Sequence, residues 1–556
     1  MPKVAIVGAG IAGLTAALRL AERGYEVSIF ERDGFVGGKF RATPWVREAT
    51  SQGAFHEHSY HMFLNWYHNF WKIAEEIGAR KGFIPLTRVL FLRRDEFPRM
   101  KQLVNFGSLA TIPQNLFSGV LPMSDMFLYM YSVLDLLSTP MAQSRYRDLI
   151  SVNGFASTRP YATEASVRMY DEYLAKTFAI ASYQSSAKTF RTFLEYGTYC
   201  PEPLYWALTG NCYEMFLKLL QEKLNKLNVR FNFHCEAIKL ELDGDGKVST
   251  ITFRQTEGFH PSLSEMSSDT AIRRRLLRKE EARAYRLDGP VILAVPPAAL
   301  EGLLSADILN RNPELGESAK LRSVPMASIH LHLNEKFSQR LKEMDTRLPR
   351  EPVVLVDSNY KLSFVANSSL WRESRGIYLN IVASDSRPLD HLLAPEMFTS
   401  DRRVGERGPG LAIEKPVTTL DHVLHEFRRF VHFEDDEIDV ELLHIDRNVG
   451  RELFINEVGS WAWRPETRTK VRNLFLAGDF CKNVIDAVCL EGAVVSGLQA
   501  AECVRREHGI GTPIRIARPR RYPYPIFWPL KISLAPYAAA AKIWSVFKDV
   551  VKGAGE

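Results

Sequence analysis

Residues 3–32 read KVAIVGAGIAGLTAALRLAERGYEVSIFER. The opening run KVAIVG is apolar and β-branched, which predicts a buried strand, and LTAALRLAERG has the periodicity of a helix that ends at Gly24. YEVSIFER predicts a second strand that closes in Glu31. A strand, a glycine-rich turn, a helix and a second strand make the unit that holds dinucleotides, so we expect an α/β fold with a Rossmann-like domain.

The turn in this unit has the spacing Gly8-x-Gly10-x-x-Gly13. Gly8 permits the tight turn, Gly10 lets the backbone approach a pyrophosphate, and Gly13 allows the helix to pack closely on the strand. The helix then presents free N–H groups and a positive dipole end to the phosphates. Glu31 follows at the distance where a carboxylate can bind ribose hydroxyls.

A second glycine motif, Gly37-Gly38-Lys39, follows shortly after Glu31. Its two glycines allow another close backbone approach, and the basic residue can face the pyrophosphate. Coupled to Glu31, this motif separates an FAD-type site from a simple NAD-type site. We therefore expect FAD as the cofactor.

A third motif lies in residues 473–496, NLFLAGDFCKNVIDAVCLEGAVVS. The predicted strand NLFLAG delivers Asp479 directly after Gly478, where a carboxylate can accept hydrogen bonds from ribityl hydroxyls. Glu491-Gly492-Ala493 opens an apolar helix. The N–H groups at its start can face the flavin ring and favour negative charge on a reduced flavin.

The two ends of the chain resemble the flavin amine oxidase superfamily, and most closely its phytoene and ζ-carotene desaturase branch. Residues 58–78 and 289–304 resemble the segments that leave the FAD domain and return to it. The substrate region carries almost no recognisable signature. The resemblance implies cofactor contacts from the following residues: Gly8, Gly10, Ala12, Gly13, Glu31, Arg32, Gly37, Gly38, Lys39, Ala237 (through its backbone, at the adenine), Gly478, Asp479, Glu491, Gly492 and Ala493.

Two positions depart from patterns in the superfamily. Lys39 stands where the family commonly has Arg, which keeps the charge but loses the fork geometry, so we expect binding to survive. Cys489 stands two positions before Glu491, where amine-oxidising members usually carry an aromatic residue. The small residue disfavours an amine oxidase, and we interpret Cys489 as a packing residue and not a reactive thiol.

Four histidines, His56, His58, His61 and His68, suggest a metal cluster at first sight. Their companions are Phe, Tyr, Met and Trp, and no carboxylate pair completes a ligand set, so we predict no metal site. We expect His61 to lie near the flavin, and it is our candidate catalytic residue. The sequence names no catalytic base.

The composition, 46% hydrophobic and 24% charged over 556 residues, is that of a globular protein with two or three domains. The six cysteines form no CxxC pair, which is typical of reduced thiols in the cytosol. We expect a cytoplasmic protein with neither a signal peptide nor a transmembrane helix. The net charge of +6 falls entirely in residues 511–556, which argues against a nucleic-acid-binding body.

The tail, residues 515–551, reads RIARPRRYPYPIFWPLKISLAPYAAAAKIWSVFKDVV. Basic residues beside interfacial aromatics predict peripheral association with an anionic membrane surface. The alternative is an arm that packs on the body or on a second subunit. Residues 116–137 add an apolar patch that is either core or an entrance from the bilayer. Together these features predict a lipid-soluble substrate.

We expect an FAD-binding domain assembled from three separated segments, beside a substrate domain with a mixed β-sheet and a helical cap. The expected boundaries are 1–107, 205–300 and 446–507 for the FAD domain, 108–204 for the helical cap, 301–445 for the substrate domain and 508–556 for the membrane-associating tail.

The expected reaction is desaturation of a long isoprenoid or carotenoid-like substrate. A hydride leaves an allylic carbon for FAD, a proton leaves the neighbouring carbon, and a membrane quinone or oxygen reoxidises the flavin. The alternatives are a polyene or fatty-acid isomerase, a dehydroxylase, an amine oxidase, and a prenyl-protein chaperone that has lost FAD. The oligomeric state, including a homo-oligomer, stays open.

Overall fold

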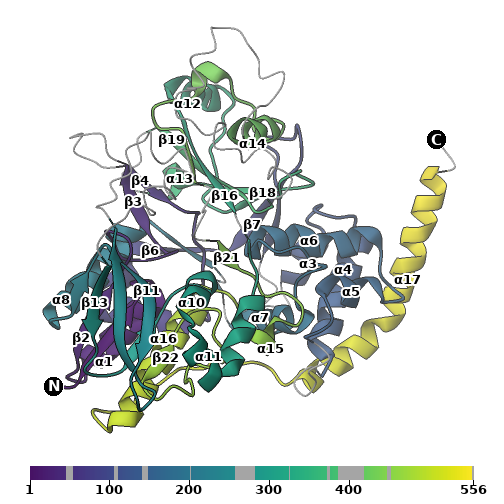
Figure 1. Cartoon of the computed structure of the whole chain (residues 1–556). Helices are drawn as coiled ribbons and strands as arrows, with labels where there is room; N and C mark the ends of the chain where they lie inside the picture. The colour runs from purple at the N-terminus through teal and green to yellow at the C-terminus, as the bar shows by residue number, and fades with distance from the viewer. Residues whose placement is uncertain are drawn as a thin grey trace.

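The computed structural model describes residues 1–45, 54–104, 111–140, 148–200, 202–203, 205–256, 282–324, 326–371, 376–385, 419–446 and 452–553. Figure 1 shows a lower α/β body, an upper β-sheet and a helical region beside them, with the last helix along its outer edge.

The α/β body contains a five-stranded parallel sheet in the order β10-β2-β1-β14-β22. Its strands come from three separated parts of the chain, as expected for a dinucleotide-binding domain built from an interrupted sequence. They are β1 (Lys3–Val7), β2 (Glu26–Phe30), β10 (Arg230–Asn232), β14 (Val291–Leu293) and β22 (Leu474–Leu476). A smaller antiparallel sheet joins β11 (Cys235–Leu242), β12 (Val248–Gln255) and β13 (Ala282–Arg286).

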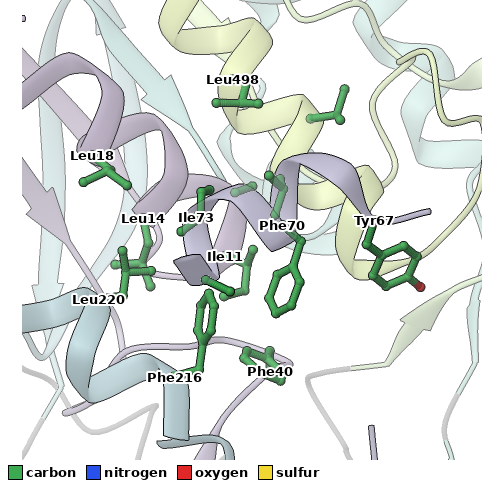
Figure 2. Packing of buried hydrophobic residues seen from close by; sticks show 14 of the residues in the cluster. Ile11, Leu14, Leu18, Phe40, Tyr67, Phe70, Ile73, Phe216, Leu220 and Leu498 are labelled. Atoms are coloured by element: carbon green, nitrogen blue, oxygen red, sulfur yellow. The ribbon is translucent and has the colours of Figure 1, made fainter. Parts of the chain in front are cut away.

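Helices pack on the parallel sheet through one large apolar core. They are α1 (Ile11–Ala21), α2 (His68–Glu76), α8 (Lys218–Lys226) and α16 (Leu490–His508). Figure 2 shows Ile11, Leu14, Phe70, Phe216 and Leu498 among the side chains that fill this core. Truncating one of the buried phenylalanines in this core to alanine lowers the free energy of unfolding by roughly 3–5 kcal/mol. The core therefore holds the separated segments together.

The upper sheet has seven strands in the order β20-β16-β19-β18-β17-β7-β8. They are β7 (Arg88–Leu92), β8 (Lys101–Val104), β16 (Ala327–Leu333), β17 (Val353–Leu355), β18 (Leu362–Ala366), β19 (Ile377–Ala383) and β20 (His444–Asp446). One face is apolar and packs against α12 (Glu335–Glu343) and α14 (Thr419–Arg428).

The expected boundary at residue 107 was wrong in one respect. We assigned the segment that holds β7 and β8 to the FAD domain, yet β7 pairs in parallel with β17 and β8 pairs with β7 in the upper sheet. Local sequence gives no sign of this, because the partner of β7 lies far along the chain.

The helical region agrees with the expected cap. It contains α3 (Thr111–Leu116), α4 (Met123–Ser138), α5 (Val152–Ser157), α6 (Glu164–Phe178) and α7 (Ala187–Tyr199). Phe91 and Val354 of the upper sheet share a core with these helices. The cap therefore covers the β7–β17 end of the upper sheet, on the face opposite α12 and α14.

Three further short strands and the tail lie outside these units. β5 (Phe63–Leu64), β9 (Tyr205–Leu208) and β6 (Phe83–Leu86) form a small sheet beside the large core. α17 (Trp528–Gly553) packs against α4. Within the described residues, no helix is both long and apolar enough to cross a bilayer.

Candidate functional site

The turn between β1 and α1 has the geometry that its glycines predict. Gly8 adopts φ +103° and donates its N–H to the carbonyl of Phe30 at 2.7 Å. A Cβ on Gly8 would lie 2.4 Å from the oxygen of Ala294, and a Cβ on Gly13 would lie 2.1 Å from the oxygen of Gly8. Any side chain at either position would therefore force the backbone apart.

The second glycine motif lies directly against the first. Gly37 adopts φ +117° and donates its N–H to the carbonyl of Ala9 at 2.9 Å. A Cβ on Gly38 would lie 3.0 Å from the Cα of Gly10, whereas a Cβ on Gly10 would meet only the Cα of Gly38, 4.0 Å away. The two loops form a cradle without side chains at the N-terminus of α1, where Gly10 is the cap residue. A pyrophosphate fits such a cradle.

Glu31 lies beside this cradle. Its carboxylate accepts the N–H of Ala9 at 2.6 Å and the N–H of Asp33 at 2.9 Å, and burial raises the pKa of Glu31. The carbonyl of Glu31 accepts the N–H of Cys235, two residues before Ala237 on β11. The structure thus brings Glu31 and Ala237 into the same neighbourhood, although nothing in the sequence between them links the two.

Arg32 and Lys39 flank the glycine loops. Arg32 is half-buried and its carbonyl accepts the hydroxyl of Thr256 at 2.7 Å. Lys39 is half-buried as well. Burial, the largest cause, lowers the pKa of His58 well below its ordinary value, and the charge of Lys39 acts in the same direction. Arg41, which the motif analysis missed, is buried and pairs with Asp33 at 2.9 Å.

The loop after β22 is held by an arginine that the motifs did not reveal. Gly478 adopts φ +151° and donates its N–H to the Oγ of Ser496 at 2.9 Å. Arg464, whose residue is 2% exposed, donates to the carbonyls of Asp479 at 2.9 Å and Phe480 at 2.9 Å. A third bond reaches the carbonyl of Cys481 at 2.8 Å. The planar guanidinium fixes the course of the loop that carries Asp479.

Glu491 links the start of α16 to the N-terminus of α2. The resemblance places it at the flavin ring edge, but both carboxylate oxygens bind the N-terminus of α2. They accept the N–H groups of Asn69 and Phe70, each at 2.9 Å, and the Nδ2 of Asn69 at 2.7 Å. The carboxylate of Glu491 is therefore occupied within the protein, and the flavin contacts of Glu491, Gly492 and Ala493 stay predictions.

Cys489 is the cap residue of α16. Its Sγ accepts the N–H of Gly492 at 3.4 Å, and burial raises the pKa of the thiol to about 12. The sulfur is a protonated thiol at neutral pH, as expected for a packing residue and not for a reactive one.

Glu57, His61 and Cys212 bring their ligand atoms within 4.8 Å of one another. The carboxylate of Glu57 accepts the N–H of Cys212 at 2.6 Å, and burial raises the pKa of Glu57 to about 7. Burial lowers the pKa of His61 to about 4, and its ring contacts Phe40 with a centroid distance of 4.9 Å. A neutral imidazole therefore lies next to the second glycine loop, beside a carboxyl that titrates near neutral pH.

The second face of the upper sheet is polar at its β20–β16–β19 end. The Oγ of Ser328 donates to Asn380 at 3.0 Å, and the Nδ1 of His330 lies 2.6 Å from the hydroxyl of Tyr378. All four residues are buried. His332 stacks on Tyr378 with centroids 4.3 Å apart, and both of its ring nitrogens are buried without a hydrogen-bond partner.

This polar face meets the loop that carries Glu57 and His61. The hydroxyl of Tyr60 lies 2.7 Å from the Oγ of Ser363 on β18. Burial, the largest cause, lowers the pKa of His330 well below its ordinary value, while a hydrogen bond with the backbone of Glu57 acts the other way. Buried polar groups without partners are rare in proteins, and where they gather beside a cofactor cradle they indicate a ligand site.

Comparison with known proteins agrees with this geometry. Residues 11–505 match the family model of flavin containing amine oxidoreductases. The chain belongs to this family. It is therefore an FAD-dependent oxidoreductase, and the glycine cradle is a fitting place for the diphosphate of FAD.

Relatives in the family include carotenoid desaturases. The ζ-carotene desaturase of Solanum lycopersicum is 23% identical over 528 residues, which cover 90% of this chain and 80% of that protein. A 1-hydroxycarotenoid 3,4-desaturase of Flavobacterium sp. is 57% identical over 42 residues, which cover 8% of this chain and 9% of that protein. Among solved structures, an oxidoreductase from Methanosarcina mazei shares the fold with a TM-score of 0.59 and 14% identity, over 90% of this chain and 100% of that one.

The histidines of residues 56–68 separate into different environments. The rings of His58 and His61 lie 5.1 Å apart, whereas His68 is exposed at the start of α2, and the side chain of His56 lies outside the described residues. The sequence offered no carboxylate pair to complete a ligand set with these histidines, and in the structure a single carboxylate, that of Glu57, lies with His61 and Cys212. Cys212 escaped notice because it lies on a distant segment and has no motif of its own.

Proposed function

We propose that this family member desaturates a long apolar isoprenoid or carotenoid-like substrate. When bound, FAD supplies the oxidising power by accepting a hydride equivalent from an allylic carbon. The observation that carries the proposal is the similarity to ζ-carotene desaturases along 90% of the chain. The thiol of Cys489, where amine-oxidising members carry an aromatic residue, further disfavours a soluble amine as substrate.

The residues of the chain would act mainly by binding and positioning. The apolar core of the cap, which reaches the upper sheet through Phe91 and Val354, holds the helices of the cap in a fixed position against that sheet. Glu57 would hold the proton released at the neighbouring carbon on its carboxylate, since its pKa of about 7 lets it gain and lose a proton near neutral pH. His61 stays neutral and would orient that carboxyl.

A second candidate reaction is favoured by one specific observation. The buried polar face with Ser328, His330, His332 and Asn380 is unlike the lining that a pure hydrocarbon needs. It suits a substrate with a hydroxyl group, so dehydroxylation of an isoprenoid alcohol, with Glu57 protonating the leaving hydroxyl, is the main alternative. A quinone as electron acceptor belongs to the desaturation proposal and would dock from the membrane.

The deciding experiment is anaerobic addition of a solubilised acyclic carotene precursor to the purified flavoprotein. Desaturation bleaches the yellow absorbance of oxidised flavin, and the product has lost two hydrogens by mass. No bleaching, with an isomer of unchanged mass, would support an isomerase. Loss of oxygen from a hydroxylated isoprenoid, given to the dithionite-reduced protein, would support dehydroxylation. A Glu57→Gln variant serves in each assay as the test of the proton-holding role.

A further inference from the structure

α17 turns polar side chains toward the body and apolar ones outward, the reverse of an ordinary surface helix. Three of its polar side chains point toward the body. The Nζ of Lys531 lies 2.6 Å from the carboxylate of Asp135, and the Oγ of Ser545 donates to Asp125 at 3.1 Å. Lys542 binds the carbonyl of Ala162. These residues recur at helical spacing and form the inner face of the helix, together with the apolar contacts of Leu534 and Ala538.

The opposite side of α17, which we call the outer face, is apolar and exposed. Ile532 is 71% exposed, Ile543 70% and Phe547 56%. Its further large members are Leu530, Tyr537, Trp544, Val546, Val550 and Val551. Water normally meets the polar side of such a helix and the body meets the apolar side. A continuous apolar face of this length marks an interaction surface.

The chemistry around the outer face fits a lipid surface. Trp544 and Tyr537 lie along it, and such amphipathic rings favour the boundary between headgroups and acyl chains. Three arginines, Arg515, Arg518 and Arg520, are exposed on the segment that leads into α17. The sequence of residues 511–548 contains no aspartate or glutamate, so no acidic side chain of that stretch repels an anionic headgroup.

We propose that the outer face of α17 lies in the plane of an anionic bilayer, with its apolar side chains inserted and the three arginines at the phosphates. The inner lysines are already bound to the cap, so they hold the helix on the body and do not contact lipid. Since α17 packs on α4, the helical cap is the part of the molecule brought nearest the membrane. The inference is independent of the proposed substrate.

The test is flotation of the full-length flavoprotein with phosphatidylcholine vesicles, with and without phosphatidylglycerol. We expect the wild-type protein to float with both, and more strongly with the anionic lipid. The double variant Trp544→Glu, Phe547→Glu should bind at least roughly tenfold more weakly, because both rings must leave the lipid. A matched control carries Met344→Glu and Ile510→Glu, two exposed apolar positions outside α17, and should float like the wild type.

The arginines give a second, separable readout. Changing Arg515, Arg518 and Arg520 to Gln should lower binding to phosphatidylglycerol vesicles by roughly fivefold for each arginine that meets the surface, and leave phosphatidylcholine binding unchanged. Equal flotation of the wild type and the Trp544–Phe547 variant overturns the proposal. So does absence of flotation together with a dimer in light scattering that the same variant dissociates, since the outer face would then join two copies of the chain.

Discussion

The parallel sheet of the body and the seven-stranded upper sheet use their strands in opposite ways. In the body, short apolar strands such as β1 and β14 are buried, and the chemistry sits in the glycine loops at their ends. In the upper sheet, β16 and β19 carry polar side chains along the strands themselves, with His330 paired to Asn380 and His332 to Tyr378. One site is built from backbone, the other from side chains.

This difference teaches how each half can be altered. The backbone site fails when a side chain is added at Gly8, Gly13 or Gly37, because the loops have no room at these positions. In a side-chain site, a replacement of similar volume leaves the fold intact but changes the chemistry of the site. The following predictions test that contrast, from the largest expected effect to the smallest.

Gly13→Val should abolish the folded flavoprotein. The new Cβ would lie 2.1 Å from the oxygen of Gly8, and backbone cannot yield as a flexible side chain can. We expect a loss of more than about 4 kcal/mol in the free energy of unfolding and no retained flavin absorbance. Gly244→Ala is the matched control and should retain both, because a Cβ added at Gly244 would meet no heavy atom within 4 Å. A stable Gly13→Val protein that retains the yellow flavin absorbance would contradict the view that the cofactor site has no room for a side chain at this position.

Arg464→Met should cost about 3–5 kcal/mol, because it leaves three carbonyls and the buried carboxylate of Asp486 without their donor. The Gly478–Asp479 loop should then loosen, and the rate of flavin release, measured by fluorescence, should rise. Arg468→Met removes an arginine from an exposed pair and should change stability by less than about 1 kcal/mol. Equal rates of flavin release from the two variants would show that Arg464 does not position the loop.

Glu57→Gln should alter the pH dependence of stability. Burial raises the pKa of Glu57 from 4.5 to about 7, so between these values the folded state keeps a proton that the unfolded state has lost. Stability contributed by this group therefore falls as pH rises through this window and stays low above it. The variant should not show this decline. At pH 8 its free energy of unfolding should exceed that of the wild type by on the order of 3 kcal/mol, and below pH 4.5 the two should not differ in this respect.

Glu491 supplies an internal reference for that measurement. Its pKa is also raised to about 7 by burial, so part of the decline with pH should remain in Glu57→Gln when unfolding is followed in urea. If the variant and the wild type decline in parallel, Glu57 does not titrate as its burial requires. In turnover assays, the same variant should lose the limb of the kcat profile near pH 7 if Glu57 holds the substrate proton.

His332→Phe should have the smallest effect on stability and a clear one on chemistry. Both ring nitrogens are buried without partners, so replacing them with carbon removes a desolvation cost, and stability should stay within about 1 kcal/mol or rise. If the polar face binds a hydroxylated substrate, kcat/KM for that substrate should fall while a hydrocarbon is unaffected. His432→Phe, on an exposed histidine, should change neither.

Much of the cofactor half could be predicted because its signals are local. Gly8, Gly13 and Gly37 need positive φ or the absence of a side chain, and glycine at such spacing is visible in one short stretch. Glu491 shows the limit of that reasoning. Its motif was recognised, but its carboxylate turned out to hold α2, because which N–H groups lie opposite a buried side chain depends on another segment.

The sequence by itself determined the α/β class, the glycine cradle and the basic, aromatic tail, since each follows from spacing or composition within a few tens of residues. Only the tertiary structure decided that Arg464 supports the Asp479 loop, that Cys212 joins Glu57 and His61, and that α17 turns its apolar side outward. These features arise from contacts between segments distant in the chain. The choice of partner there depends on how whole elements pack, which no local pattern encodes.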